Sequence, residues 1–153
     1  MADLVSIRDL PQRWSAQAPY TAAALRIVAA FLFICHGTMK LFGFPPGHGP
    51  VPLLSQAGFA GFLEVVGGTM VLLGLFTRPV AFVLSGEMAF AYFIAHAPKS
   101  FWPALNGGEL AALYCFIWLY YSAAGAPVWS LDAWRAKHRS QVSAGRPAFG
   151  TMH

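Results

Sequence analysis

The sequence predicts an all-α fold, an integral membrane bundle of four transmembrane helices. The 153 residues are 57% hydrophobic and only 10% charged, whereas about a quarter of the residues of an ordinary soluble domain are charged. The mean hydropathy is +0.54, and the apolar residues gather in four long segments. The chain therefore lacks the charge to cover a water-facing surface, and we expect a lipid bilayer to surround it.

The four expected helices follow one another with short connections rich in proline and glycine. Each approaches the roughly 20 helical residues that cross a bilayer, with about 17 tolerated. The tight turn at Arg78 separates the second helix from the third. The predicted transmembrane domain covers residues 20–126, with helices at 20–42, 57–76, 77–97 and 107–124.

The segments outside this domain are polar, and most of the basic residues lie in them. Residues 1–19 carry Arg8 and Arg13, and residues 127–153 hold a predicted interfacial helix, with Ser130 as its N-cap, and a basic tail. Since lysine and arginine accumulate in cytoplasmic segments, we expect both termini in the cytoplasm and the chain in a bacterial inner membrane. The net charge of +4 then favours anionic lipid, and not nucleic acid, as the partner.

Half of the six acidic residues lie inside the apolar segments, namely Glu64, Glu87 and Glu109. A charge at the centre of a membrane helix costs about 2.5–3.5 kcal/mol on insertion scales. These carboxylates should therefore face the bundle interior and meet basic groups there. Counting the helical rise from each helix centre brings Arg26 within reach of Glu87, which predicts a structural ion pair between them.

A second polar cluster is expected in the outer half of the bundle. His36 and Lys40 are four residues apart and share a helix face, and Glu64 and Glu109 fall at a similar depth on other helices. His96 also lies near the outer end. Simpler roles stay open, because Lys40 could extend to the headgroups and Glu109 could act only at the start of its helix.

Aromatic residues of the fourth helix extend this cluster into a candidate ligand pocket. One face of that helix carries Glu109, Leu113, Phe116 and Tyr120. Aromatic side chains beside polar groups suit a flat, apolar ligand. The predicted ligand-binding residues are His36, Lys40, Glu64, Glu109 and Tyr120, and among them Glu64, His36 and Glu109 are the candidate catalytic residues.

We expect neither a metal ion nor a haem. Cys35 and Cys115 form no CxxC motif and no zinc spacing. The chain lacks the Glu-x-x-His motif of carboxylate-bridged iron sites. His36 and His96 both lie toward one side of the bilayer, which disfavours a bis-histidine haem. Any source of electrons should therefore belong to a partner protein.

Three stretches carry a resemblance to a known family: LRIVAAFLFICHGTMKLFG, GFLEVVGGTMVLLGLFTRPVAFVLSGEMAFAYF and NGGELAALYCFIWLYYSAAGAPVWSLDAW. Over residues 23–134 the chain resembles the DoxX family of small four-helix membrane proteins. The resemblance implies four transmembrane helices and cytoplasmic termini. DoxX relatives include membrane subunits of a thiosulfate:quinone oxidoreductase and proteins linked to oxidative stress or to quinone resistance. The recurring polar positions of the family match Arg26, His36, Lys40, Glu64, Glu87 and Glu109.

These observations predict an inner-membrane subunit that binds a quinone or a similar small apolar redox molecule and works with an oxidoreductase system. Whether the chain itself is catalytic stays open, since a quinone-linked subunit of this kind would depend on a redox partner protein. Two other functions stay open as well. The chain could be a non-catalytic anchor or assembly subunit of a larger redox complex, or a small-molecule transporter, which would require a homo-oligomer.

Overall fold

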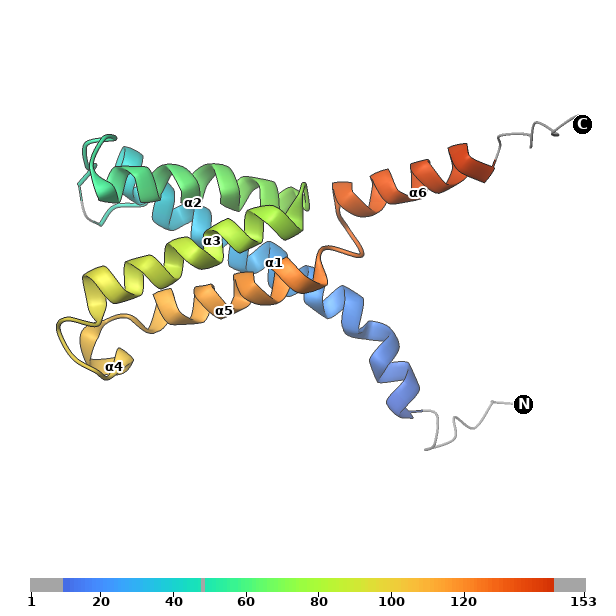
Figure 1. Cartoon of the computed structure of the whole chain (residues 1–153), viewed down its shortest axis with the longest axis horizontal. Coiled ribbons are helices and arrows are strands. Elements are labelled where there is room, and N and C mark those ends of the chain that lie inside the picture. Colours follow the sequence, from blue (N-terminus) through green and yellow to red (C-terminus); the bar gives the residue numbers. More distant parts are fainter. Residues whose placement is uncertain (1–9, 48, 145–153) are drawn as a thin grey trace, which may run out of the picture.

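The computed structural model describes residues 10–47 and 49–144, and every regular element within those ranges is helical. The all-α prediction is confirmed for this part of the chain. Four helices form a bundle, and two smaller ones lie at its opposite ends (Figure 1). The bundle helices are α1 (Leu10–Phe42), α2 (Gln56–Leu73), α3 (Thr77–Ala91) and α5 (Glu109–Ala124); the others are α4 (Pro103–Asn106) and α6 (Leu131–Ala144).

Within the part of the chain that the structure describes, three helical segments are long and apolar enough to cross a membrane. They are Trp14–Phe42, Gln56–Leu73 and Thr77–His96. The last of these is α3 continued by one π-helical turn, η2 (Tyr92–His96). Helix α5 is also apolar, but it has only 16 residues. The prediction of four membrane-spanning helices therefore holds for three, and the fourth is present as a shorter apolar helix.

The ends of the bundle differ in what they carry. The terminal end carries the start of α1 and the root of α6, and the loop end carries α4 and the connection between α1 and α2 (Figure 1). Helix α1 begins well before the expected residue 20 and includes Pro19. Residues 1–9 with Arg8, and the basic tail from residue 145 onward, lie outside the described residues.

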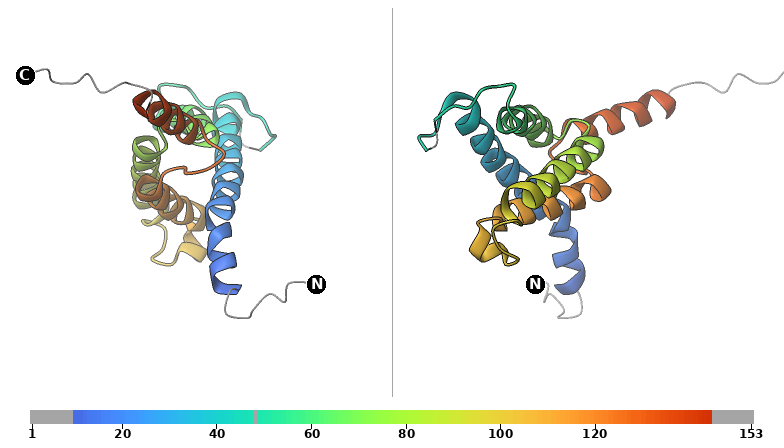
Figure 2. Two further views of the ribbon diagram at one scale, coloured as in Figure 1. Left: turned by 90° about the vertical axis from the view of Figure 1, so that its right-hand side faces the viewer. Right: turned by 60° about the vertical axis from the view of Figure 1, so that its left-hand side comes forward.

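Two antiparallel pairs make up the bundle, α1 with α2 and α3 with α5 (Figure 2). Glycine permits the close approach of the first pair. A Cβ atom at Gly37 would lie 2.8 Å from the carbonyl oxygen of Gly61 and 2.7 Å from Val65 Cγ2. The backbones of α1 and α2 therefore meet at this level with no room for a larger side chain.

Aromatic side chains fill the space between the two pairs. The ring centroid of Phe33 on α1 lies 5.1 Å from that of Tyr114 and 5.3 Å from that of Trp118, both on α5. Nearer the terminal end, the Tyr121 hydroxyl donates a hydrogen bond to the carbonyl of Ala22. This buried aromatic core closes the middle and the terminal half of the bundle.

Arg26 lies in the terminal half, and it does not form the predicted ion pair with Glu87. Its guanidinium donates to the carbonyl oxygens of Leu72 at 2.6 Å, of Trp129 at 2.7 Å and of Val71. Two of these carbonyls belong to the last turn of α2, where the helix leaves them without a full set of partners and where its dipole attracts a cation. The prediction failed because it considered only carboxylates as partners.

Hydrogen bonds attach the first turn of α6 to the bundle. Ser130 accepts a hydrogen bond from the N–H of Ala133 at 3.0 Å, which confirms the predicted N-cap. The Asp132 carboxylate accepts from the N–H groups of Phe76 and Thr77, at 2.9 and 2.8 Å, at the start of α3. Although burial alone would raise the pKa of Asp132, these hydrogen bonds and the charge of Arg135 hold it below its ordinary value.

Candidate functional site

A cavity of about 380 Å³ lies in the loop half of the bundle, beyond the aromatic core. Helix α1 contributes Phe33, His36 and Lys40 to its wall, α2 contributes Glu64, and α5 contributes Tyr114. Further residues of α3, η2 and α5, together with Gly107 between α4 and α5, complete the lining. A mainly apolar wall with a few converging polar groups is typical of sites for small molecules.

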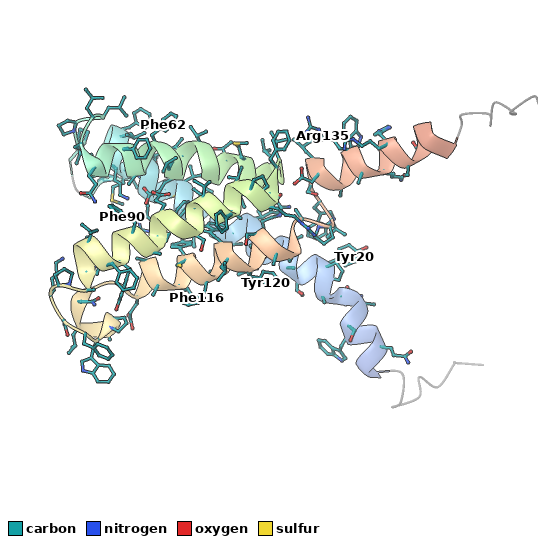
Figure 3. The ribbon with its side chains drawn as sticks, viewed as in Figure 1. Tyr20, Phe62, Phe90, Phe116, Tyr120 and Arg135 are labelled. Carbon is teal, nitrogen blue, oxygen red and sulfur yellow. The ribbon has the colours of Figure 1, made fainter. Side chains whose placement is uncertain are left out.

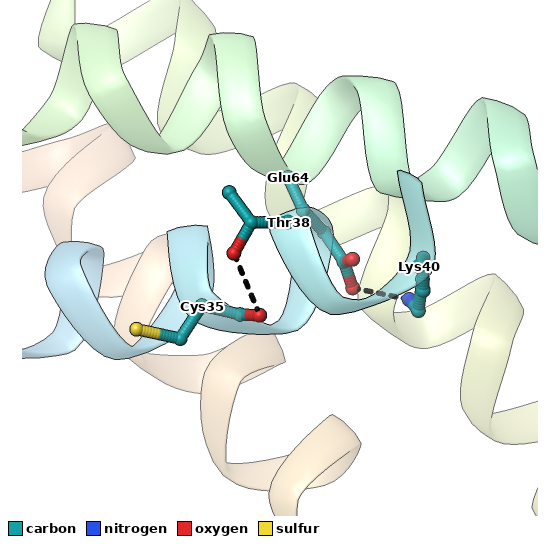
Figure 4. A network of polar contacts seen from close by, with 4 residues as sticks. All are labelled: Cys35, Thr38, Lys40 and Glu64. Atoms are coloured by element: carbon teal, nitrogen blue, oxygen red, sulfur yellow. Dashed lines mark hydrogen bonds and ion pairs between the residues drawn. The ribbon is translucent and has the colours of Figure 1, made fainter. Parts of the chain in front are cut away.

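The charged wall of the cavity is an ion pair between α1 and α2. Lys40 Nζ lies 2.6 Å from Glu64 Oε1 (Figure 4). The ammonium group of Lys40 therefore points toward Glu64 in the bundle. It does not extend to the lipid headgroups, which was the simpler role considered for it. Close packing at Gly37, where a Cβ would lie 2.9 Å from Glu64 Cβ, brings the two helices into reach.

Glu64 is the most deeply buried polar group of the cavity, with only 2% of its surface exposed. Its second carboxylate oxygen, Oε2, is buried, and no donor among the described residues reaches it. A buried acceptor without a donor is unusual and costly. The cavity wall therefore holds an acceptor that a ligand hydroxyl or a proton can satisfy.

His36 and Tyr114 form the aromatic wall together with Phe33. The ring of His36 lies edge-on to that of Tyr114, with the centroids 6.2 Å apart. Because His36 is one helical turn before Lys40, both present their nitrogen atoms on the same face of α1. A flat ring in the cavity would thus contact aromatic surface on one side and find hydrogen-bonding nitrogen atoms at its edge.

The π-helical turn η2 shapes the end of the cavity. Such turns insert a residue into a helix and are frequent at functional sites. His96 Nδ1 lies 3.1 Å from the carbonyl oxygen of Asn106. The Asn106 side chain donates to the Ser100 carbonyl at 2.8 Å and accepts from the N–H of Gly108 at 2.7 Å. These bonds hold the α4 segment beside the cavity and keep His96 in its wall.

The structure brings together three of the five predicted ligand-binding residues, His36, Lys40 and Glu64. The other two, Glu109 and Tyr120, are exposed and do not line the cavity. Tyr120 points away from the bundle, as does Phe116 on the same face of α5 (Figure 3). The predicted pocket face of α5 is instead its outer face. Because α5 is apolar all around, its sequence gave little indication of which side faces the core.

Sequence reasoning missed two residues that shape the site, Tyr114 and Asn106. A signal for Tyr114 was available, since Ala111, Tyr114, Trp118 and Tyr121 recur at helical spacing and all four are buried. For Asn106, the following pair of glycines indicated a turn, but nothing indicated that the side chain would be buried within it.

Comparisons with known proteins identify the family of the chain. The DoxX family model matches residues 21–97. An uncharacterized protein of Haemophilus influenzae is 48% identical over 123 residues, which cover 74% of this chain and 90% of that protein. An uncharacterized membrane protein of Mycobacterium tuberculosis is 28% identical over 154 residues, which cover 88% and 93%. No solved structure matches the chain. The chain is a multi-pass membrane protein and belongs to the DoxX family.

Proposed function

We propose that the cavity binds the head of a quinone or a similar small apolar redox molecule, and that the chain works with an oxidoreductase partner. One observation carries the proposal: the cavity of about 380 Å³ combines aromatic walls with a lysine–glutamate pair inside apolar helices. A quinone head is flat, carries oxygen atoms at opposite edges and partitions into lipid. Each of these properties has a counterpart in the cavity wall.

The residues would then have distinct roles. Lys40 or His36 would donate a hydrogen bond to a ligand oxygen, while Phe33 and Tyr114 contact the ring. Glu64 would accept a hydrogen bond from a ligand hydroxyl and would hold the proton that this oxygen gains or loses. Electrons would come from the partner protein, so the chain would bind, orient and exchange protons.

The same proposal includes the placement of the chain in an inner membrane with both termini in the cytoplasm. Helix α5 runs alongside α3 back to the terminal end (Figure 1), which supports a fourth crossing. Its 16 residues extend about 24 Å, a shortfall that local thinning of the bilayer can accommodate. Arg135, Lys137 and Arg139 on α6 support a cytoplasmic terminal end.

Organic extraction followed by mass spectrometry tests the ligand directly. We expect protein purified from quinone-containing membranes to retain a quinone in near-stoichiometric amount. Glu64→Gln should lower the retained quinone at least tenfold, and Ala111→Trp should remove it, because Ala111 lines the cavity. Leu113→Trp, on the exposed face of the same helix, is the matched control and should retain it.

Two results would contradict the proposal. One is the absence of quinone from folded wild-type protein, even after incubation with excess quinone. The other is equal retention in the Ala111→Trp and Leu113→Trp variants, which would show that the quinone binds outside the cavity. Circular dichroism of each variant distinguishes loss of the ligand from loss of the fold.

The anchor-subunit alternative is favoured by the position of α6, which projects from the terminal end with Arg135, Lys137 and Arg139 along it (Figure 1). A purely structural subunit would capture its partner through such a surface and would not need the cavity. The Ala111→Trp variant would then support wild-type amounts of the assembled complex and wild-type electron transfer. A loss of electron transfer in an intact complex would favour quinone binding.

A further inference from the structure

The loop half of the bundle contains a second buried carboxyl group, Glu87 of α3. Both of its oxygens are buried, and no donor among the described residues reaches either of them. The ion pair of Lys40 and Glu64 therefore accounts for one acid and one base and leaves Glu87 as an additional acid. Two carboxyl groups share the neighbourhood of a single ammonium group.

Helix register places Glu87 level with Glu64. A Cβ atom at Gly67 of α2 would lie 2.7 Å from Leu84 Cδ2 of α3, so these two positions are opposite one another. Because α2 and α3 are antiparallel, moving three residues toward the loop end leads from Gly67 to Glu64 and from Leu84 to Glu87. Glu87 is correspondingly within electrostatic range of both Glu64 and Lys40.

The other polar groups at this level do not neutralise the additional acid. His36 of α1 faces Tyr114 of α5, and the buried Ser85 hydroxyl donates to the Cys115 carbonyl at 2.8 Å. Arg26, a cation of the terminal half, is occupied by carbonyl oxygens. An ionised carboxylate with no donor and no counterion is costly inside a protein that is surrounded by hydrocarbon.

We propose that Glu64 and Glu87 hold one negative charge between them against Lys40, so that one of the two carboxyl groups carries a proton. In the observed arrangement Glu64 is the carboxylate bound to Lys40, and Glu87 is the protonated group. Transfer of the proton from Glu87 to Glu64 leaves Glu87 as the carboxylate and does not change the total charge. The pair is therefore a proton-exchange site beside the cavity.

This site does not require a quinone, because the shared charge exists in the empty cavity. Its consequence for a ligand is general. A ligand hydroxyl that donates a hydrogen bond to the open acceptor of Glu64 stabilises the state in which Glu64 is the carboxylate and Glu87 holds the proton. Failure of the quinone proposal would leave this inference standing, and the reverse is also true.

Infrared spectroscopy of the protein after ligand extraction, in a maltoside detergent that contains no carbonyl group, tests the proposal. We expect one carbonyl band of a protonated carboxyl group at neutral pH, shifted by exchange into D2O. The band should disappear in Glu87→Gln and also in Glu64→Gln, since the remaining acid must then ionise beside Lys40. In Lys40→Met the area of the band should double, because both acids are then protonated.

Glu109→Gln is the matched control, because Glu109 is exposed at the start of α5, and the band should be unchanged. A wild-type protein without the band would overturn the proposal, since both acids would then be ionised. A band that persists in Glu87→Gln would overturn it as well. If a variant fails to fold, the wild-type spectrum alone still decides whether a buried carboxyl group is protonated.

Discussion

Arg26 and Glu64 are both fully buried charged residues, and the bundle provides them with different kinds of partner. Glu64 has a charged partner, Lys40, at 2.6 Å. Arg26 has carbonyl oxygens of α2 and of the segment before α6. A guanidinium group has five donors in a fixed geometry, so it can join several backbone groups that converge from different elements. Arg26 therefore connects parts of the chain that are distant in sequence.

Replacement of Arg26 by leucine should strongly destabilise the protein. The carbonyl groups of Val71, Leu72 and Trp129 would lose a donor, and a buried polar group left without its partner costs about 1–3 kcal/mol. We expect the free energy of unfolding in detergent to fall by about 3 kcal/mol or more, and the melting temperature of the helical circular dichroism signal to fall with it.

Glu87→Gln provides the comparison for this prediction. If Arg26 acts through carbonyl groups, replacing Glu87 by glutamine should leave the melting temperature close to that of the wild type. Equal losses in Arg26→Leu and Glu87→Gln, with no further loss in the double variant, would instead indicate an ion pair between the two residues.

At the scale of helices, the contact of α1 with α2 determines whether the cavity has a charged wall. Lys40 and Glu64 can meet because the backbones approach closely at Gly37 and Gly61. Glycine lowers helix propensity by about 1 kcal/mol relative to alanine. The close packing of α1 against α2 must therefore compensate for the low helix propensity of glycine. Glycine-to-alanine substitutions can separate the effect of packing from the effect of helix propensity.

Gly37→Ala should lower the free energy of unfolding by about 1–3 kcal/mol, because the new methyl group would overlap with Val65 and with the Gly61 carbonyl. Gly86→Ala in α3 is the matched control, since a Cβ there meets nothing within 4 Å, and it should be neutral or slightly stabilising. Thermal unfolding of both variants in the same detergent measures the difference. Equal stability of the two variants would show that the close contact at Gly37 is unimportant.

At the scale of the whole molecule, two helical pairs enclose a core at the terminal end and a cavity at the loop end. The large rings of Trp118 and Tyr121 fill the core at the terminal end. The small residues Ala111 and Gly107 leave space for the cavity at the loop end. The cavity therefore lies toward the end that carries α4. The direction of the chain in the membrane decides which compartment that end faces.

Single cysteines test this direction. In a variant with Cys35 and Cys115 replaced by alanine, Ala104→Cys in α4 should react with a membrane-impermeant maleimide added to intact spheroplasts. Ser140→Cys in α6 should react only after the membrane is permeabilised. Labelling of both positions from the same side would show that α5 does not cross the bilayer, because these residues lie on either side of that helix in the chain.

The sequence was sufficient to predict the four apolar helical segments and three of the polar residues that line the cavity, His36, Lys40 and Glu64. Long apolar segments make the helical positions evident. A carboxylate such as Glu64 has a high free-energy cost in contact with lipid, so it is expected in the interior of the bundle. His36 and Lys40 followed from their spacing on one helix. These predictions depend on local sequence and on the cost of charge in lipid, and both can be evaluated before the fold is known.

The sequence was not sufficient for features that depend on tertiary contacts. The orientation of α5 is one of them, because both of its faces are apolar and only packing against Phe33 selects the face with Tyr114. The partners of Arg26 are another, since every residue has a backbone carbonyl and the sequence does not indicate which carbonyls a buried arginine will contact. The position of His96 is a third, because its Nδ1 atom contacts the backbone carbonyl of Asn106, which local sequence does not specify.

The root of α6 determines how force would pass through the molecule. Asp132 binds the start of α3, its N–H group binds the Gly74 carbonyl after α2, and the preceding Trp129 carbonyl binds Arg26 of α1. Because residues 129–132 are attached to three helices, the start of α6 cannot rotate independently of the bundle. A load applied to the far end of α6, about 20 Å away along its 14 residues, would therefore act as a torque on the bundle itself.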